Sequence, residues 1–119
     1  MSTTLITVEP GTRVMEAARL MYRGRAGSAL VMEGDRLIGI FTERDIVRAL
    51  SGGHSDAGRT ASVSSYMTAE PQTIGPDSSV GEALDRMLSG GFRHLPVTEG
   101  DRVIGIVSMR DLAQSISKD

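Results

Sequence analysis

The stretch that decides the fold is Glu33-Gly-Asp-Arg-Leu-Ile-Gly-Ile-Phe-Thr-Glu-Arg-Asp-Ile46, because nearly the same pattern returns as Glu99-Gly-Asp-Arg-Val-Ile-Gly-Ile-Val-Ser-Met-Arg-Asp-Leu112. The copies are 66 residues apart, and residues 7–46 match residues 73–112 without a gap, with seventeen of forty positions identical. A repeat of this density indicates one supersecondary unit built twice. We therefore divide the chain into a first repeat with its connector, residues 1–58, and a second repeat, residues 59–119.

Each copy predicts a hairpin, a buried strand and the start of a helix. Gly34-Asp35 and Gly100-Asp101 separate apolar runs, as in a two-residue turn whose Gly adopts a positive φ. The runs 37–41 and 103–107 are continuously apolar, which is typical of strands buried on both faces.

Thr42 and Asp45, and equally Ser108 and Asp111, stand at capping-box spacing at the start of the next helix. One interpretation is structural: the side chains only satisfy the unpaired amides of the helix start. The other is functional: a helix N-terminus that follows a strand can bind phosphate, and a nearby carboxylate can accept hydrogen bonds from ribose. Gly39 and Gly105 favour the second, because a Gly inside a strand indicates a bulge or a close approach of backbone or ligand.

The flanking patterns complete a β-α-β-β-α unit in each half. In the first half we expect strands at 5–8 and 28–32 and helices from an N-cap at Thr12 to Arg23 and over 43–50; in the second, a strand at 72–75, a helix entry at 76–79 and a buried stripe over 80–87. Residues 63–68 predict one short helical turn. The fold class is thus α/β (α+β), with two pseudo-symmetric repeats packed through their sheets, since one copy alone would leave a sheet face bare.

The halves diverge at Pro96, where the first copy has Leu30. A proline removes an amide from a strand, so we expect an edge or an interrupted ladder there, with backbone groups between His94 and Val97 open to other contacts.

Composition excludes several classes of function. The net charge is −2 and the twelve Arg are scattered among fifteen acids, so no basic stripe for nucleic acid is present. The chain has no cysteine, and its two histidines, His54 and His94, form no metal-ligand spacing. No apolar run is long enough to span a membrane, and the N-terminus is unlike a signal peptide. These features predict a soluble cytoplasmic protein.

The doubled unit, the Gly-x-x-Thr/Ser-x-x-Asp motifs at 39–45 and 105–111, Arg93-His-Leu-Pro-Val97 and Tyr66-Met-Thr68 together resemble a tandem pair of cystathionine β-synthase (CBS) domains, also called a Bateman module. The resemblance covers nearly the whole chain. It implies a stand-alone regulatory module that binds AMP, ADP, ATP or S-adenosylmethionine in clefts between the two repeats.

The resemblance also assigns roles to residues of this chain. Asp45 and Asp111 would bind ribose hydroxyls, and Thr42 and Ser108 would contact phosphate. Other phosphate contacts would come from Arg44, Arg93, His94 and Arg110. The adenine would lie against Thr7, Val8, Ala29 and Leu30 in one site, and against Thr73, Ile74, Leu95 and Pro96 in the other. The first repeat departs from the family pattern at Ser28-Ala-Leu30, where the hydrophobic-Pro pair is lost, so we expect its site to differ from the usual shape.

Three classes of function remain to be separated. The first is an adenine-nucleotide sensor that forms a homodimer through its helices and signals to an unknown protein partner, with Mg²⁺ at the phosphates left open. The alternative is a dimeric interaction or scaffold module with the same fold and no significant nucleotide affinity. An enzyme is the weakest class, because no nucleophile, base and orienting group occur together.

Overall fold

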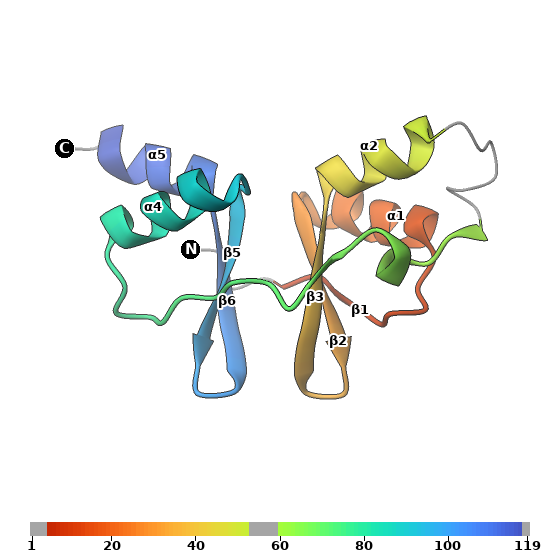
Figure 1. Cartoon of the computed structure of the whole chain (residues 1–119), viewed down its shortest axis with the longest axis horizontal. Coiled ribbons are helices and arrows are strands. Elements are labelled where there is room, and N and C mark those ends of the chain that lie inside the picture. Colours follow the sequence, from red (N-terminus) through yellow and green to blue (C-terminus); the bar gives the residue numbers. More distant parts are fainter. Residues whose placement is uncertain (1–4, 53–59, 118–119) are drawn as a thin grey trace. The chain divides into compact units, whose positions relative to one another are not determined.

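The computed structural model describes residues 5–52 and 60–117, and their contacts divide the chain into two compact units (Figure 1). One unit is Ile6–Pro71, and the other contains Gln72–Asp119. The sequence repeat places the boundary between residues 58 and 59. In the structure, the segment up to Pro71 lies with the first unit instead. Part of the predicted connector, including His54, lies outside the described residues.

The first unit is a four-stranded sheet with two helices. Its elements are β1 (Thr7–Val8), α1 (Val14–Gly24), β2 (Ser28–Glu33), β3 (Arg36–Thr42), α2 (Glu43–Ser51), a 3₁₀ turn η1 (Val63–Ser65) and β4 (Thr68–Ala69). The strand order is β1-β2-β3-β4, with β1 parallel to β2 and the other pairs antiparallel. Figure 1 shows α1 and α2 together at one end of the β2–β3 hairpin, whose turn extends away from them. This order confirms the predicted β-α-β-β-α unit and the short helical turn.

The second unit repeats the helices and the hairpin. Its elements are α4 (Val80–Gly90), β5 (His94–Glu99), β6 (Arg102–Ser108) and α5 (Met109–Ser117), and β5 pairs antiparallel with β6. The strand predicted over 72–75 is reduced, in the described part of the chain, to a parallel bridge between Ile74 and Val97. Pro96 explains the reduction, because it cannot donate the next hydrogen bond of such a ladder.

The two hairpins share their turn and their irregularity. Gly34 and Gly100 adopt φ of 61° and 63°, as predicted for the first residue of the turn. Val31 pairs with Gly39 but Met32 pairs with Leu37, which leaves Ile38 as an extra residue, and the second hairpin shifts register at the corresponding place. A β-bulge therefore lies beside the motif glycine in both units.

The apolar stripes of the helices form the cores. The buried side chains of α1 are Val14, Ala17 and Met21, and those of α4 are Ala83 and Met87. The prediction of Thr12 as the N-cap of α1 is wrong: Arg13 occupies that position without a capping side-chain hydrogen bond, and the Thr12 hydroxyl accepts instead from the Glu9 amide at 3.2 Å. In α4 the equivalent Ser79 does cap, accepting from the Glu82 amide at 3.0 Å.

Candidate ligand-binding site

Thr42 and Asp45, the first predicted pair of motif residues, contact each other at the start of α2. The Thr42 amide donates to Oδ2 of Asp45 at 2.9 Å, and the Thr42 hydroxyl donates to the same oxygen at 3.3 Å. Asp45 is buried, with 4% of its surface exposed. Its carboxylate thus serves as the capping group that the spacing predicted.

Ser108 and Asp111 form a capping box at the start of α5, as Thr42 and Asp45 do at the start of α2. The Ser108 amide donates to Oδ2 of Asp111 at 3.0 Å, and the Asp111 amide donates to the Ser108 hydroxyl at 3.0 Å. Asp111 is half-buried, so this carboxylate is more accessible than that of Asp45.

Arg48 distinguishes the two motifs and was not among the predicted site residues. Its Nη1 lies 3.1 Å from Oδ1 of Asp45 and donates to the Tyr66 carbonyl at 3.4 Å, and its Cζ lies 5.8 Å from the centroid of the Tyr66 ring. Both oxygens of Asp45 are therefore engaged within its own unit. The sequence signal was the three-residue spacing of Asp45 and Arg48 on one helix, which places opposite charges on the same face.

The hairpin register brings further predicted residues to the second motif. His94 pairs with Ser108, and the Met109 amide donates to the Arg93 carbonyl at 2.8 Å. One end of the β5–β6 hairpin therefore holds four predicted site residues: Arg93, His94, Ser108 and Asp111. Arg110 is exposed on the first turn of α5, as Arg44 is on the first turn of α2.

The residues predicted to contact adenine lie on paired backbone segments. Thr7 pairs with Leu30 and Val8 with Val31, next to Ala29, and the Leu30 amide donates to the Ile6 carbonyl at 2.8 Å.

In the second unit, Ile74 joins β5 through two hydrogen bonds, from its amide to the Pro96 carbonyl at 3.0 Å and from the Thr98 amide to its carbonyl at 2.8 Å. Thr73 is half-buried, and Leu95 and Pro96 are buried. The expectation that the backbone between His94 and Val97 is open is therefore wrong at the Pro96 carbonyl.

The interpretation of Gly39 as a sign of ligand approach also needs correction. A Cβ at residue 39 would overlap the sulfur and neighbouring carbons of Met67. The missing side chain thus makes room for Met67 and for the adjacent bulge, so Gly39 does not support a ligand site.

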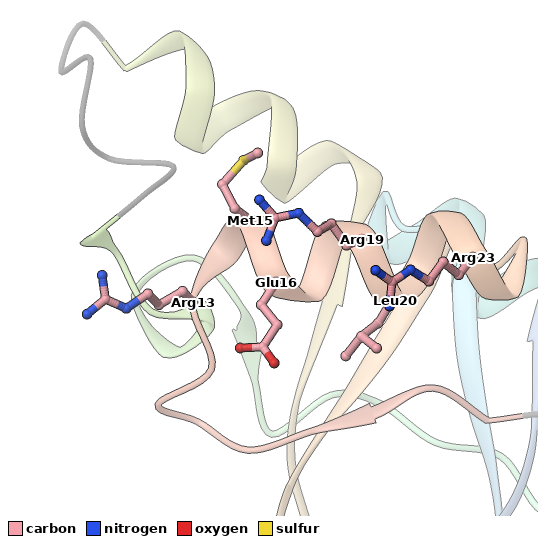
Figure 2. Close-up of a pocket in the computed structure, with 6 residues that line it drawn as sticks. All are labelled: Arg13, Met15, Glu16, Arg19, Leu20 and Arg23. Atoms are coloured by element: carbon pink, nitrogen blue, oxygen red, sulfur yellow. The ribbon is translucent and has the colours of Figure 1, made fainter.

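A separate hollow runs along α1 and is lined by no residue of either motif. It is lined by Arg13, Met15, Glu16, Arg19, Leu20 and Arg23, and none of these was a predicted site residue (Figure 2). Three arginines and one glutamate give this surface a positive balance.

Two further properties concern the described residues. Among them, no group of three or more His, Cys, Asp or Glu side chains is placed to hold a metal ion. In the same part of the chain, no helix has the length and hydropathy needed to cross a membrane.

Comparison with known proteins identifies the family. The model of the CBS domain matches residues 1–52 and again residues 63–118. A 17.7 kDa protein from the bps2 3′ region of Acidianus ambivalens is 40% identical over 117 residues, which cover 97% of this chain and 69% of that protein.

Two solved structures have the same fold. The CBS-domain containing protein ATU1752 from Agrobacterium tumefaciens is 34% identical with a TM-score of 0.89, covering 96% of this chain and 85% of that one. The CBS domain pair of protein MJ0100, in complex with 5′-methylthioadenosine and S-adenosyl-L-methionine, is 26% identical with a TM-score of 0.86, covering 99% and 92%. The repeated units, their doubled motifs and the match over both halves show that this chain belongs to the CBS domain family, as a tandem CBS pair.

Proposed function

We propose that the chain is a regulatory module that binds an adenosine compound: AMP, ADP, ATP or S-adenosylmethionine. The observation that carries the proposal is the doubled Thr/Ser-x-x-Asp helix start in a chain that is similar over 99% of its length to a CBS pair bound to two adenosine compounds.

The chemistry of the motif residues fits such a ligand. A carboxylate such as that of Asp111 accepts hydrogen bonds from the two hydroxyls of a ribose, and charge-assisted bonds of this kind are strong. The amides of a helix start and the Ser108 hydroxyl can donate to a phosphate or another anionic group. Arg93 and Arg110 add positive charge beside the same helix start. Mg²⁺ at the phosphates of ADP or ATP stays open, and thermal unfolding is therefore measured with and without it.

An interaction or scaffold module without significant nucleotide affinity is the second candidate. The observation in its favour is that Asp45 and Asp111 already cap their own helices. The variants Asp45→Ala and Asp111→Ala separate the candidates, because a sensor loses affinity for its ligand and a scaffold loses only stability.

We also propose that the module forms a homodimer through its helices and acts in the cytoplasm without catalytic activity. Large apolar side chains are exposed on α1, α2, α4 and α5: Tyr22, Val47, Leu50, Leu88 and Ile116. The exposed charges of α1 and α4 differ, since Arg19 on α1 corresponds to Asp85 on α4 in the repeat. This complementarity favours contact between α1 of one copy and α4 of the other.

The test is thermal unfolding of the purified chain with AMP, ADP, ATP, S-adenosylmethionine and 5′-methylthioadenosine, each with and without Mg²⁺. A ligand at a hundred times its dissociation constant adds about 2.7 kcal/mol to the free energy of unfolding, which raises the midpoint by roughly ten degrees in a domain of this size. A shift with one adenosine compound that Asp111→Ala removes supports the sensor. No shift with any of them rejects it.

A further inference from the structure

We propose that the two motif sites are unequal: Arg48 occupies the first, and an adenosine compound binds first and more tightly at the second, around Asp111. The inference rests on the proposed function, and it names the residue that decides which repeat holds the ligand.

The contacts of Asp45 indicate that groups of the protein itself already occupy the first motif. One carboxylate oxygen receives the Thr42 amide and hydroxyl, and the other receives Arg48 Nη1. Arg48 is held from two sides, because it also donates to the Tyr66 carbonyl and lies over the Tyr66 ring. A ribose hydroxyl at Oδ1 of Asp45 would have to share this oxygen with the guanidinium, and Asp45 itself is 4% exposed.

The arginine at position 48 is not repeated in the second unit. Position 48 corresponds to Gln114, whose neutral amide cannot form an ion pair with Asp111. Asp111 is half-buried where Asp45 is buried. The motif aspartate of the second unit is therefore the more exposed residue and has no arginine three positions further along its helix.

A backbone difference favours the second repeat independently. The Leu30 amide donates to the Ile6 carbonyl at 2.8 Å in the first unit. The equivalent donor is absent at Pro96, so the carbonyl of the exposed Gln72 receives no hydrogen bond from β5 at this point. That carbonyl is a suitable acceptor for the exocyclic amine of a purine. One hydrogen bond and one partly exposed ion pair together predict about a tenfold difference in affinity between the sites.

Isothermal titration of the full chain with AMP, and separately with S-adenosylmethionine, tests the inference. We expect one tight equivalent per chain, with the other site about tenfold weaker. Asp111→Asn should remove the tight equivalent and Asp45→Asn should retain it, and both keep a carbonyl oxygen for the helix cap. Circular dichroism checks that each variant is folded.

A reciprocal exchange at positions 48 and 114 tests the role of Arg48. Arg48→Gln should bring the first site to within a few-fold of the second, and Gln114→Arg should weaken the second. Two equal sites in the unaltered chain, or loss of the tight site in Asp45→Asn alone, would overturn the inference while leaving the proposed function in place. No binding of either compound overturns both.

Discussion

The side chain of Met67 covers Gly39 so closely that a methyl group at residue 39 would overlap its sulfur. Met67 immediately precedes β4, and β4 pairs with β3 at Gly39 itself, opposite Ala69. The contact and the pairing together attach the segment after the connector to the first sheet. They explain why this segment belongs to the first structural unit.

The variant Gly39→Ala should therefore destabilise the chain. The added methyl group forces the flexible Met67 side chain to shift, and overpacking of this kind costs about 1 kcal/mol. Urea denaturation followed by circular dichroism measures the loss. Gly11→Ala is the matched control, because a Cβ at Gly11 meets nothing within 4 Å.

The double variant Gly39→Ala/Met67→Ala tests the cause. Met67→Ala alone removes a half-buried side chain, but it also makes room for the methyl group at residue 39. The free energies of the two single changes should therefore not add, and the double variant should be more stable than their sum by about 1 kcal/mol. Additive losses would show that Met67 is not the reason for the glycine.

Most of the fold could be predicted because it rests on local patterns that occur twice. Apolar stripes at helical spacing fixed α1 and α4, and the Gly-Asp turns fixed the two hairpins. The N-cap of α1 could not be predicted from residue type. Thr12 is the better capping residue, but the helix begins after Arg13 because the backbone at this point pairs with residues 61–63. The shortened strand near Ile74 could have been anticipated, since Pro96 lacks the amide that a longer ladder needs.

Ser79→Ala should lower the stability of the second unit. The Ser79 hydroxyl accepts from the Glu82 amide at 3.0 Å, and the loss of such a cap costs about 1 kcal/mol. Ser78→Ala is the matched control, because Ser78 precedes the capping position. Equal losses of unfolding free energy in the two variants would contradict the role of Ser79.

Asp45→Ala should cost more stability than Asp111→Ala. Both remove an acceptor for a backbone amide, worth about 1 kcal/mol, but Asp45 is buried and also accepts from the Thr42 hydroxyl and Arg48. We expect about 2 kcal/mol for Asp45→Ala in urea denaturation. Asp45→Asn should recover part of this loss, since its amide oxygen can still accept from the Thr42 amide. A larger loss at Asp111 would show that the second motif is the more important cap.

The two motifs of the candidate site could be predicted from the sequence. The difference in burial and charge surroundings between Asp45 and Asp111 could not. The spacing of Thr42 and Asp45 gave the capping contacts directly, because they are three residues apart on one helix. Arg48 was missed, since its second anchor, Tyr66, is eighteen residues away and meets it only in the folded unit. Motif matching therefore treated as equal two carboxylates that differ in burial and in charge environment.

The charges of α1 and α4 predict how a homodimer is held together. Arg19 and Asp85 are exposed at equivalent positions of the two helices. If α1 of one copy faces α4 of the other, a two-fold dimer contains this ion pair twice, and Asp85→Arg replaces both pairs with repulsion. Exposed pairs contribute about 0.2–1 kcal/mol each, so the loss of two pairs should weaken the dimer roughly twofold to thirtyfold in sedimentation equilibrium. Arg19→Asp should weaken it similarly, and the double exchange Arg19→Asp/Asp85→Arg should restore it. A dimer in which α1 faces α1 instead places the two Arg19 side chains together, so Arg19→Asp would leave like charges opposed and the double exchange would rescue nothing.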